Sequence, residues 1–165
     1  MTRSGTAALT LPTDEQILIT RTFDAPAHLV YRAWTTPELV KRWWHARRGV
    51  VTIVEIDLRV GGRWRYVMIA DDGTEVGFHG EYREIVPNER IVSTETFEGL
   101  PEGVSEEDGT TVNTATFAEA DGRTTLALLV QAPSKATRDA IIDSGMEAGL
   151  QDALDNLEQV AVSLG

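Results

Sequence analysis

The sequence predicts an α+β domain in which one curved, seven-stranded antiparallel sheet wraps around a long C-terminal helix. Three observations predict this fold class. A strand-like stretch near the start is followed by two short helical segments. Six later stretches alternate apolar and polar residues with the period of two that strands show. Residues 135–162 then repeat apolar side chains at helical spacing, and such a helix is long enough to cover one face of a sheet.

The chain begins with a stretch that lacks periodicity. Residues 1–14 are rich in Thr, Ser and Ala, so we expect a flexible tail ahead of a single domain at 15–165. The first strand follows at QILITRTF (16–23), where Ile17 and Ile19 alternate with polar residues.

Two short helices are expected after this strand, and each is marked by a proline. Pro26 suits the first position of a helix in DAPAHLVYRAW. Pro37 repeats the signal behind Thr36, which can serve as the N-cap of a helix in TTPELVKRWW. Both helices precede the second strand and should close one end of the sheet.

The six remaining strands are predicted from their alternation and from the turns between them. Asp72-Gly73 and Asp121-Gly122 predict tight hairpins of the primed type. Sequential hairpins form an antiparallel meander rather than a parallel sheet with crossover helices. The acidic loop 98–109 has no basic partner and is expected to be a solvated connection. The strands are VVTIVEIDL, RWRYVMIA, TEVGFHGEYREI, RIVSTETF, TVNTATFAEA and RTTLALLVQA.

The C-terminus is expected to form one continuous helix, capped by Ser134 and running from about 135 to 162. Gly145 and Gly149 lie one turn apart inside it, and each costs about 1 kcal/mol relative to Ala. Close packing, or space for another molecule, must offset this cost. The narrow apolar stripe of one helix cannot fill the concave face of a twisted sheet, so we expect a cavity between them.

Composition excludes several classes of partner and site. The chain carries 26 acidic and 15 basic residues, and this balance argues against nucleic acid as the main partner and against anionic membranes. No cysteine is present, which excludes disulfides, thiolate metal sites and thiol catalysis. The sequence has no apolar run long enough for membrane insertion and no secretory signal, so the reducing cytoplasm is the expected location.

Five spaced blocks of the sequence resemble the START-like (SRPBCC) superfamily, and within it the branch similar to the C-terminal domain of the activator of heat shock protein 90 ATPase. The resemblance covers about residues 16–162. It implies the helix-grip (START/Bet v-like) fold, which supports binding of lipids, hormones, aromatics and polyketides and a few chemistries. The blocks are ITRTFDAPAHLVYRAWTTPELVKRWW, IDLRVGGRWRYVM, FHGEYREIVPNERIVSTETF, GRTTLALLV and SGMEAGLQDALDNLEQV.

The stretch KRWWHARR (41–48) places two tryptophans between pairs of basic residues. In relatives these helices flank the mouth of the cavity. One interpretation is that the tryptophans belong to the core beside a solvated basic edge. The other is that a basic rim, formed by Lys41, Arg42, Arg47 and Arg48, attracts an anionic small molecule.

The sequence contains no convincing catalytic constellation. The three histidines are far apart and lack zinc-ligand spacing, so we expect neither a metal site nor a cofactor. His79 should lie on the outer face of the sheet, opposite in direction to Phe78. Glu55 and Asp57 share one face of a strand and could act as acid and base. The favoured interpretation is an ion-paired strand end near Arg59, Arg63 and Arg65.

Apolar side chains that share the inner face of the strands, together with those facing them on the helix, are the candidates for lining a ligand cavity. Alternatively these side chains fill one another completely. The candidates are Trp44, Trp64, Tyr66, Met68, Phe78, Tyr82, Phe97, Met146, Gly149, Leu150 and Ala153.

The leading hypothesis is binding of a small hydrophobic or amphipathic molecule without established catalysis. A chaperone-associated or stress-related interaction domain is the second hypothesis, although relatives that stimulate the chaperone ATPase carry a further N-terminal domain. The third is a cyclase- or aromatase-type enzyme in which Tyr66, Tyr82, His45 or a buried carboxylate acts as acid or base. A homodimer through sheet edges or outer faces is left open by the sequence.

Overall fold

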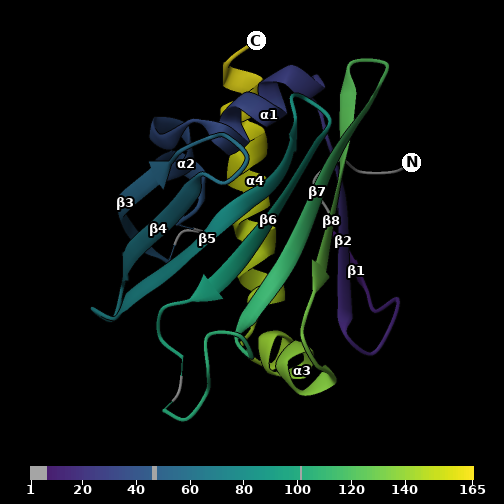
Figure 1. The fold of residues 1–165 in the computed structure, drawn as a ribbon. Coiled ribbons are helices and arrows are strands. Elements are labelled where there is room, and N and C mark those ends of the chain that lie inside the picture. Colours follow the sequence, from purple (N-terminus) through teal and green to yellow (C-terminus); the bar gives the residue numbers. More distant parts are fainter. Residues whose placement is uncertain (1–6, 46–47, 101) are drawn as a thin grey trace.

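The structure is a computed structural model that describes residues 7–45, 48–100 and 102–165. The described residues form one sheet of eight strands and four helices (Figure 1). In chain order these elements are β1 (Ala8–Thr10), β2 (Gln16–Phe23), α1 (Ala27–Thr35), α2 (Pro37–Trp43), β3 (Gly49–Ile56), β4 (Arg63–Ala70), β5 (Glu75–Val86), β6 (Arg90–Phe97), β7 (Thr110–Ala120), β8 (Arg123–Gln131), α3 (Lys135–Asp143) and α4 (Met146–Ser163).

All neighbouring strands are antiparallel, in the order β1-β2-β8-β7-β6-β5-β4-β3. The α+β class and the antiparallel meander are confirmed, and the architecture is consistent with a helix-grip fold. The hairpin between β7 and β8 has positive φ at both Asp121 and Gly122, as the primed type requires. Between β4 and β5 Gly73 alone has positive φ while Asp72 does not, so the primed type predicted for this hairpin is wrong.

The prediction of seven strands was wrong by one. The additional strand, β1, lies inside the stretch for which we expected a tail, and Leu9 pairs with Ile19 of β2. Three residues are too few to show an alternation of apolar and polar side chains. Backbone hydrogen bonds to the neighbouring strand, which the sequence does not display, create this strand.

The C-terminal helix is divided in two, which corrects the prediction of one continuous helix. Ser134 caps α3 as predicted, since its hydroxyl accepts a hydrogen bond from the Thr137 amide over 3.1 Å. The break lies at Gly145, whose φ of 84° is left-handed and which serves as the N-cap of α4. A left-handed residue cannot continue a right-handed helix, so the chain changes direction here.

Helix α4 lies across the inner face of the sheet, with α1 beside its C-terminal end and α3 near its start (Figure 1). Its second half is sealed against the sheet, because Leu154, Leu157 and Ala161 have no exposed surface. In its first half Met146 and Leu150 pack against the core but are only partly buried. Helix α4 is therefore more fully buried toward its C-terminal end than toward its N-terminal end. None of the helices within the described ranges has the length and apolarity needed to cross a membrane.

Candidate functional site

Aromatic side chains from three strands and from the end of α2 meet on the inner side of the sheet. We call Trp44, Trp64, Tyr66, Phe78 and Phe97 the aromatic cluster. The ring centroids of Tyr66 lie 5.4 Å from Trp44 and 4.9 Å from Trp64. Those of Phe78 lie 5.9 Å from Trp44 and 5.2 Å from Phe97.

Strand register produces this cluster. Tyr66 on β4 is directly opposite Phe78 on β5, and Phe78 is opposite Phe97 on β6. Residues opposite each other in adjacent strands point to the same face, so these rings gather on the inner side of the sheet. The structure thus brings together five of the residues that the sequence analysis selected.

The cluster is not sealed from solvent. Trp44, Tyr66 and Phe78 are partly buried, and Phe97 is 36% exposed. The neighbouring Trp43 differs, because it is 4% exposed, donates its indole N–H to the Ala33 carbonyl over 2.9 Å and stacks on Trp34. Within KRWWHARR, Trp43 is therefore a core residue and Trp44 belongs to the aromatic cluster.

The other predicted site residues divide between partly exposed and buried positions. Met68, Met146, Gly149 and Leu150 keep accessible surface, whereas Tyr82 and Ala153 are buried. We use the name inner recess for the part of the inner face and of α4 that carries the aromatic cluster, Met68, Met146, Gly149 and Leu150.

One basic residue of the predicted rim lies at the edge of this region. Arg48 pairs with Asp152 of α4 over 3.6 Å, and a Cβ placed on Gly149 would lie 3.9 Å from the Arg48 Nε. Lys41 and Arg42 are exposed. Arg47, the fourth predicted rim residue, lies outside the described residues. The ion pair links α4 to the segment before β3, so the rim contains charges of both signs.

A polar group on the inner face was missed by the sequence analysis. Glu95 on β6 accepts a hydrogen bond from Asn113 Nδ2 on β7 over 3.1 Å. Thr111 in turn donates its hydroxyl to Asn113 Oδ1 over 2.9 Å. Glu95 lies two residues before Phe97, so the alternation that placed Phe97 inside could also have placed Glu95 there.

Burial changes the protonation behaviour of this polar group. Loss of hydration raises the pKa of Glu95 to about 7, although the hydrogen bond from Asn113 lowers it. The pKa of Tyr66 is raised well above its usual value by burial first, then by the charges of Tyr82 and Glu95. Glu95 nevertheless keeps some accessible surface. It is thus surrounded by protein and still reachable by a small molecule.

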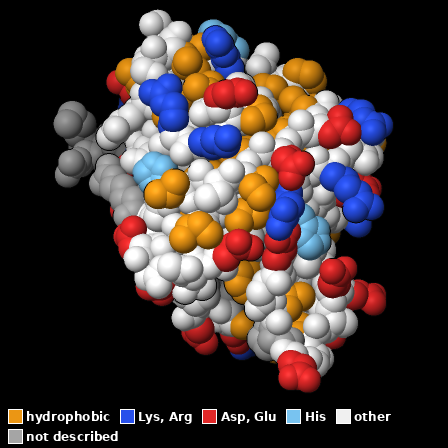
Figure 2. Space-filling view, turned by 90° about the vertical axis from the view of Figure 1, so that its left-hand side faces the viewer, with side chains coloured by type: hydrophobic (Ala, Val, Ile, Leu, Met, Phe, Trp, Pro, Cys, Tyr) orange, Lys and Arg blue, Asp and Glu red, His pale blue; other side chains and the backbone are white. Residues whose placement is uncertain are grey.

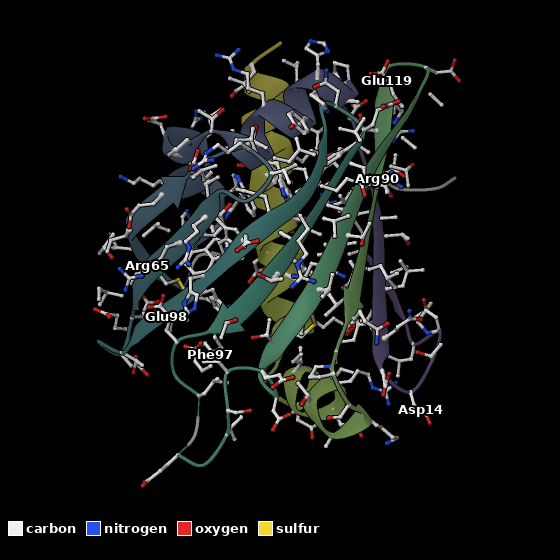
Figure 3. The ribbon with its side chains drawn as sticks, viewed as in Figure 1. Asp14, Arg65, Arg90, Phe97, Glu98 and Glu119 are labelled. Atoms are coloured by element: carbon white, nitrogen blue, oxygen red, sulfur yellow. The ribbon has the colours of Figure 1, made fainter. Side chains whose placement is uncertain are left out.

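The outer face of the sheet carries a separate, open depression of about 830 Å³. Glu98 accepts a hydrogen bond there from Arg65 Nε over 2.9 Å, and Figure 3 labels both residues. Glu98 also pairs with His79 Nδ1 over 2.9 Å. The hydrogen bond from Arg65 is the main cause that lowers the pKa of Glu98; burial, the next largest cause, raises it, and the hydrogen bond from His79 lowers it further. Asp57 pairs with Arg59 over 2.8 Å.

These pairs show that His79 lies on the outer face, as predicted, and that Asp57 belongs to an ion-paired strand end. Figure 2 shows the side of the molecule that carries β3 and β4, where acidic and basic side chains lie next to one another. Two ion-paired groups therefore lie in the depression, Asp57 with Arg59 and Glu98 with Arg65 and His79. No group of three or more His, Cys, Asp or Glu residues able to hold a metal is found in the described part of the chain.

Comparison with known proteins decides the family. The sequence model of the family described as Activator of Hsp90 ATPase homolog 1-like protein matches residues 24–161. This chain belongs to that family. The resemblance seen in the sequence blocks is therefore confirmed. Membership in the Activator of Hsp90 ATPase homolog 1-like family indicates a ligand-binding or chaperone-associated domain. No curated protein matches the chain.

Solved structures show the same fold. A protein from Rhodobacter sphaeroides has a TM-score of 0.85 at 23% identity, with 96% of this chain and 99% of that chain covered. A protein from Chromobacterium violaceum has a TM-score of 0.77 at 29% identity, covering 90% and 98%. An AHSA1-like protein from Aeromonas hydrophila has a TM-score of 0.63 at 24% identity, covering 90% and 94%.

Proposed function

We propose that this domain binds a small hydrophobic or amphipathic molecule in the inner recess, between the sheet and the first half of α4. One observation carries the proposal. Trp44, Tyr66 and Phe78 retain accessible surface on the inner face, while α4 seals the same face completely at Leu154 and Leu157. The expected location is the cytoplasm.

The energetic argument concerns this accessible apolar surface. Covering apolar surface contributes roughly 25 cal/mol per Å², so rings left open to water favour an apolar partner. Small-molecule sites typically combine apolar walls with a few polar groups. The aromatic cluster and Leu150 form such walls, and Glu95 with Asn113 are polar groups beside them.

Binding can be tested with naphthalene as a probe. We expect saturating naphthalene to raise the melting temperature by several degrees, because it binds the folded state alone. Leu150→Trp should remove this shift by filling the inner recess from the helix side, and Met68→Trp should do so from the sheet side. Val162→Trp is the control, since Val162 lies on the same helix and is 50% exposed.

The proposal fails if naphthalene leaves the melting temperature of the wild type unchanged. It also fails if both blocking variants fold and keep the wild-type shift. Native mass spectrometry of the purified protein adds an independent measurement, because a co-purified small molecule should appear as an added mass that Leu150→Trp lacks.

The family description supports a second candidate, activation of a chaperone ATPase. Steady-state ATP hydrolysis by Hsp90, measured with and without added protein, tests it directly. We expect no stimulation if the domain functions as a ligand-binding protein. Stimulation that persists in Leu150→Trp would make chaperone binding the main function, because that variant lacks an open recess.

A further inference from the structure

We infer that Glu95, held in place by Asn113 and Thr111, binds the hydroxyl group of a phenol- or alcohol-type ligand whose apolar part lies against the aromatic cluster. The inference rests on the proposed function and identifies the chemical class of the ligand. No residue selected from the sequence supplies this polar contact.

Three side chains on two adjacent strands form a directed hydrogen-bond chain. Glu95 lies opposite Thr111, and Asn113 lies opposite Ser93 on the same face. The Thr111 hydroxyl donates to Asn113 Oδ1 over 2.9 Å, which turns the Asn113 amide nitrogen toward Glu95. That nitrogen donates to Glu95 Oε2 over 3.1 Å. Because Thr111 is 5% exposed, its hydroxyl cannot readily exchange this acceptor for water.

Buried apolar residues flank this chain along both strands, and Ser93, opposite Asn113, is a further polar residue on the same face. Ile91 precedes Glu95 by four residues on β6 and is 3% exposed, and Ala115 follows Asn113 on β7 and is 4% exposed. Burying polar groups costs free energy unless each is hydrogen-bonded. A carboxyl group placed here therefore needs partners, and the structure supplies one.

One oxygen of Glu95 is left to accept a further hydrogen bond. Asn113 reaches Oε2, and among the described residues no donor reaches Oε1 and no cation pairs with the carboxylate. The carboxyl group retains accessible surface. A ligand hydroxyl can donate a hydrogen bond to this oxygen.

The surroundings favour a neutral hydroxyl over a charged amine as that donor. Bringing a second charge into this apolar region would require removal of its hydration. Burial raises the pKa of Glu95 to about 7, so both the carboxylate and the carboxylic acid are populated near neutral pH. A hydroxyl group suits both forms, since it can donate to the carboxylate and accept from the acid.

The aromatic cluster is adjacent to Glu95. Trp64 donates its indole N–H over 3.1 Å to the carbonyl of Thr94, the residue before Glu95. Glu95 is also near enough to Tyr66 for its charge to raise the pKa of that phenol. An aromatic ring packed against Tyr66 can thus present its own hydroxyl to Glu95.

A matched pair of probes tests the inference. Naphthalene and 2-naphthol share the same apolar rings, and only 2-naphthol carries a hydroxyl. We expect wild-type protein to bind 2-naphthol about ten-fold more tightly, as a hydrogen bond to a charged or partly charged acceptor can provide. Glu95→Leu should reduce this ratio to about one while naphthalene still binds. Affinities can be measured by fluorescence titration at fixed pH and salt.

Two further variants serve as controls for the role of Glu95. Glu95→Gln keeps an acceptor oxygen of nearly the same shape, so it should retain part of the preference for 2-naphthol. Glu81→Gln removes an exposed carboxyl group from β5 and should leave the wild-type ratio unchanged.

The possible failures are distinguishable. If Glu95→Leu binds both probes with the wild-type ratio, the role of Glu95 is overturned while ligand binding in the inner recess stands. If wild-type protein prefers naphthalene or shows no preference, the hydroxyl class is overturned. If neither probe binds the wild type, or if Leu150→Trp and Met68→Trp both fold and leave binding intact, the proposed function itself fails.

Discussion

Arg21 Nη1 donates to Asp155 Oδ1 over 2.7 Å, which joins the inner face of β2 to the middle of α4. Arg21 Nη2 also reaches Glu158 over 3.2 Å, and the guanidinium lies 5.0 Å from the ring centroid of Phe23. The arginine side chain is 1% exposed, while the two carboxylates are 39% and 21% exposed. The ion pair therefore lies where the tightly sealed half of α4 meets the sheet.

The first prediction concerns this buried arginine. The double variant Asp155→Ala/Glu158→Ala leaves a guanidinium in the interior without its carboxylates, so we expect a loss of about 3–5 kcal/mol in the free energy of unfolding. Arg21→Met should cost less, because methionine fills the space and the exposed carboxylates can be hydrated. Urea denaturation measures both. Equal losses in the two variants would show that the unpaired buried charge is not the cause.

The second prediction contrasts two glycines that the sequence presents as equivalent. Gly145→Ala should lower stability by about 1 kcal/mol, because its φ of 84° is unfavourable for alanine. Gly149→Ala should raise stability by up to about 1 kcal/mol, since Gly149 lies within α4 and its nearest neighbour would be 3.9 Å from the new Cβ. Thermal denaturation of both variants measures whether each substitution raises or lowers the stability. Changes in the same direction would contradict the different roles of the two glycines.

The third prediction separates the adjacent tryptophans. Trp43→Ala should destabilise the protein by about 3–5 kcal/mol, because this side chain is buried and its indole N–H is bonded to Ala33. Trp44→Ala should cost less and should weaken naphthalene binding, since Trp44 is partly exposed in the aromatic cluster. Denaturation and fluorescence titration on both variants test this. If Trp44→Ala binds naphthalene with the affinity of the wild type, Trp44 is not part of the binding site.

The fourth prediction is a pH dependence caused by Glu95. Its pKa is about 7 in the folded protein against 4.5 for the ordinary group, so the folded state retains a proton that the unfolded state has already lost. The free energy of unfolding should therefore decrease by at most about 3 kcal/mol as pH rises from 4.5 to about 7. It should be constant above this range. Glu95→Gln should lack this decrease.

Urea midpoints at several pH values between 4.5 and 8 test the effect, and the wild type minus Glu95→Gln difference removes the contribution of other titrating groups. Tyr66, on the facing strand β4, also interacts with Glu95, but burial raises its pKa well above this range. If the difference in stability between the wild type and Glu95→Gln stays constant over this pH range, Glu95 ionises with an ordinary pKa. Glu81→Gln provides the control with an exposed carboxyl group.

Periodicity made most of the architecture predictable. Strand β4, for example, was expected from RWRYVMIA and occupies Arg63–Ala70 in the structure. Alternation also placed Tyr66 and Phe78 on one face, where their rings now lie in one cluster with Trp44. Such patterns are local, since the direction of a side chain on a strand depends on its position within that strand alone.

The polar residues of the site were harder to predict from the sequence. Glu95 and Asn113 are 18 residues apart, and register alone brings them within 3.1 Å of each other. Glutamate and asparagine on strands usually face water, so neither residue type signals an inner position. Their selection requires knowledge of which face the neighbouring strands bury and of how much hydration is lost there.

The sequence by itself determined the α+β class, the antiparallel order of hairpins and the family, because side-chain alternation, turn residues and spaced blocks are properties of the chain. Tertiary structure alone decided that β1 pairs with β2, that Gly145 interrupts the C-terminal helix, and that Glu95 is bonded to Asn113 and lies near Tyr66. Each of these depends on backbone dihedral angles or on contacts between distant strands. Their free energies arise only when the folded chain brings those groups together.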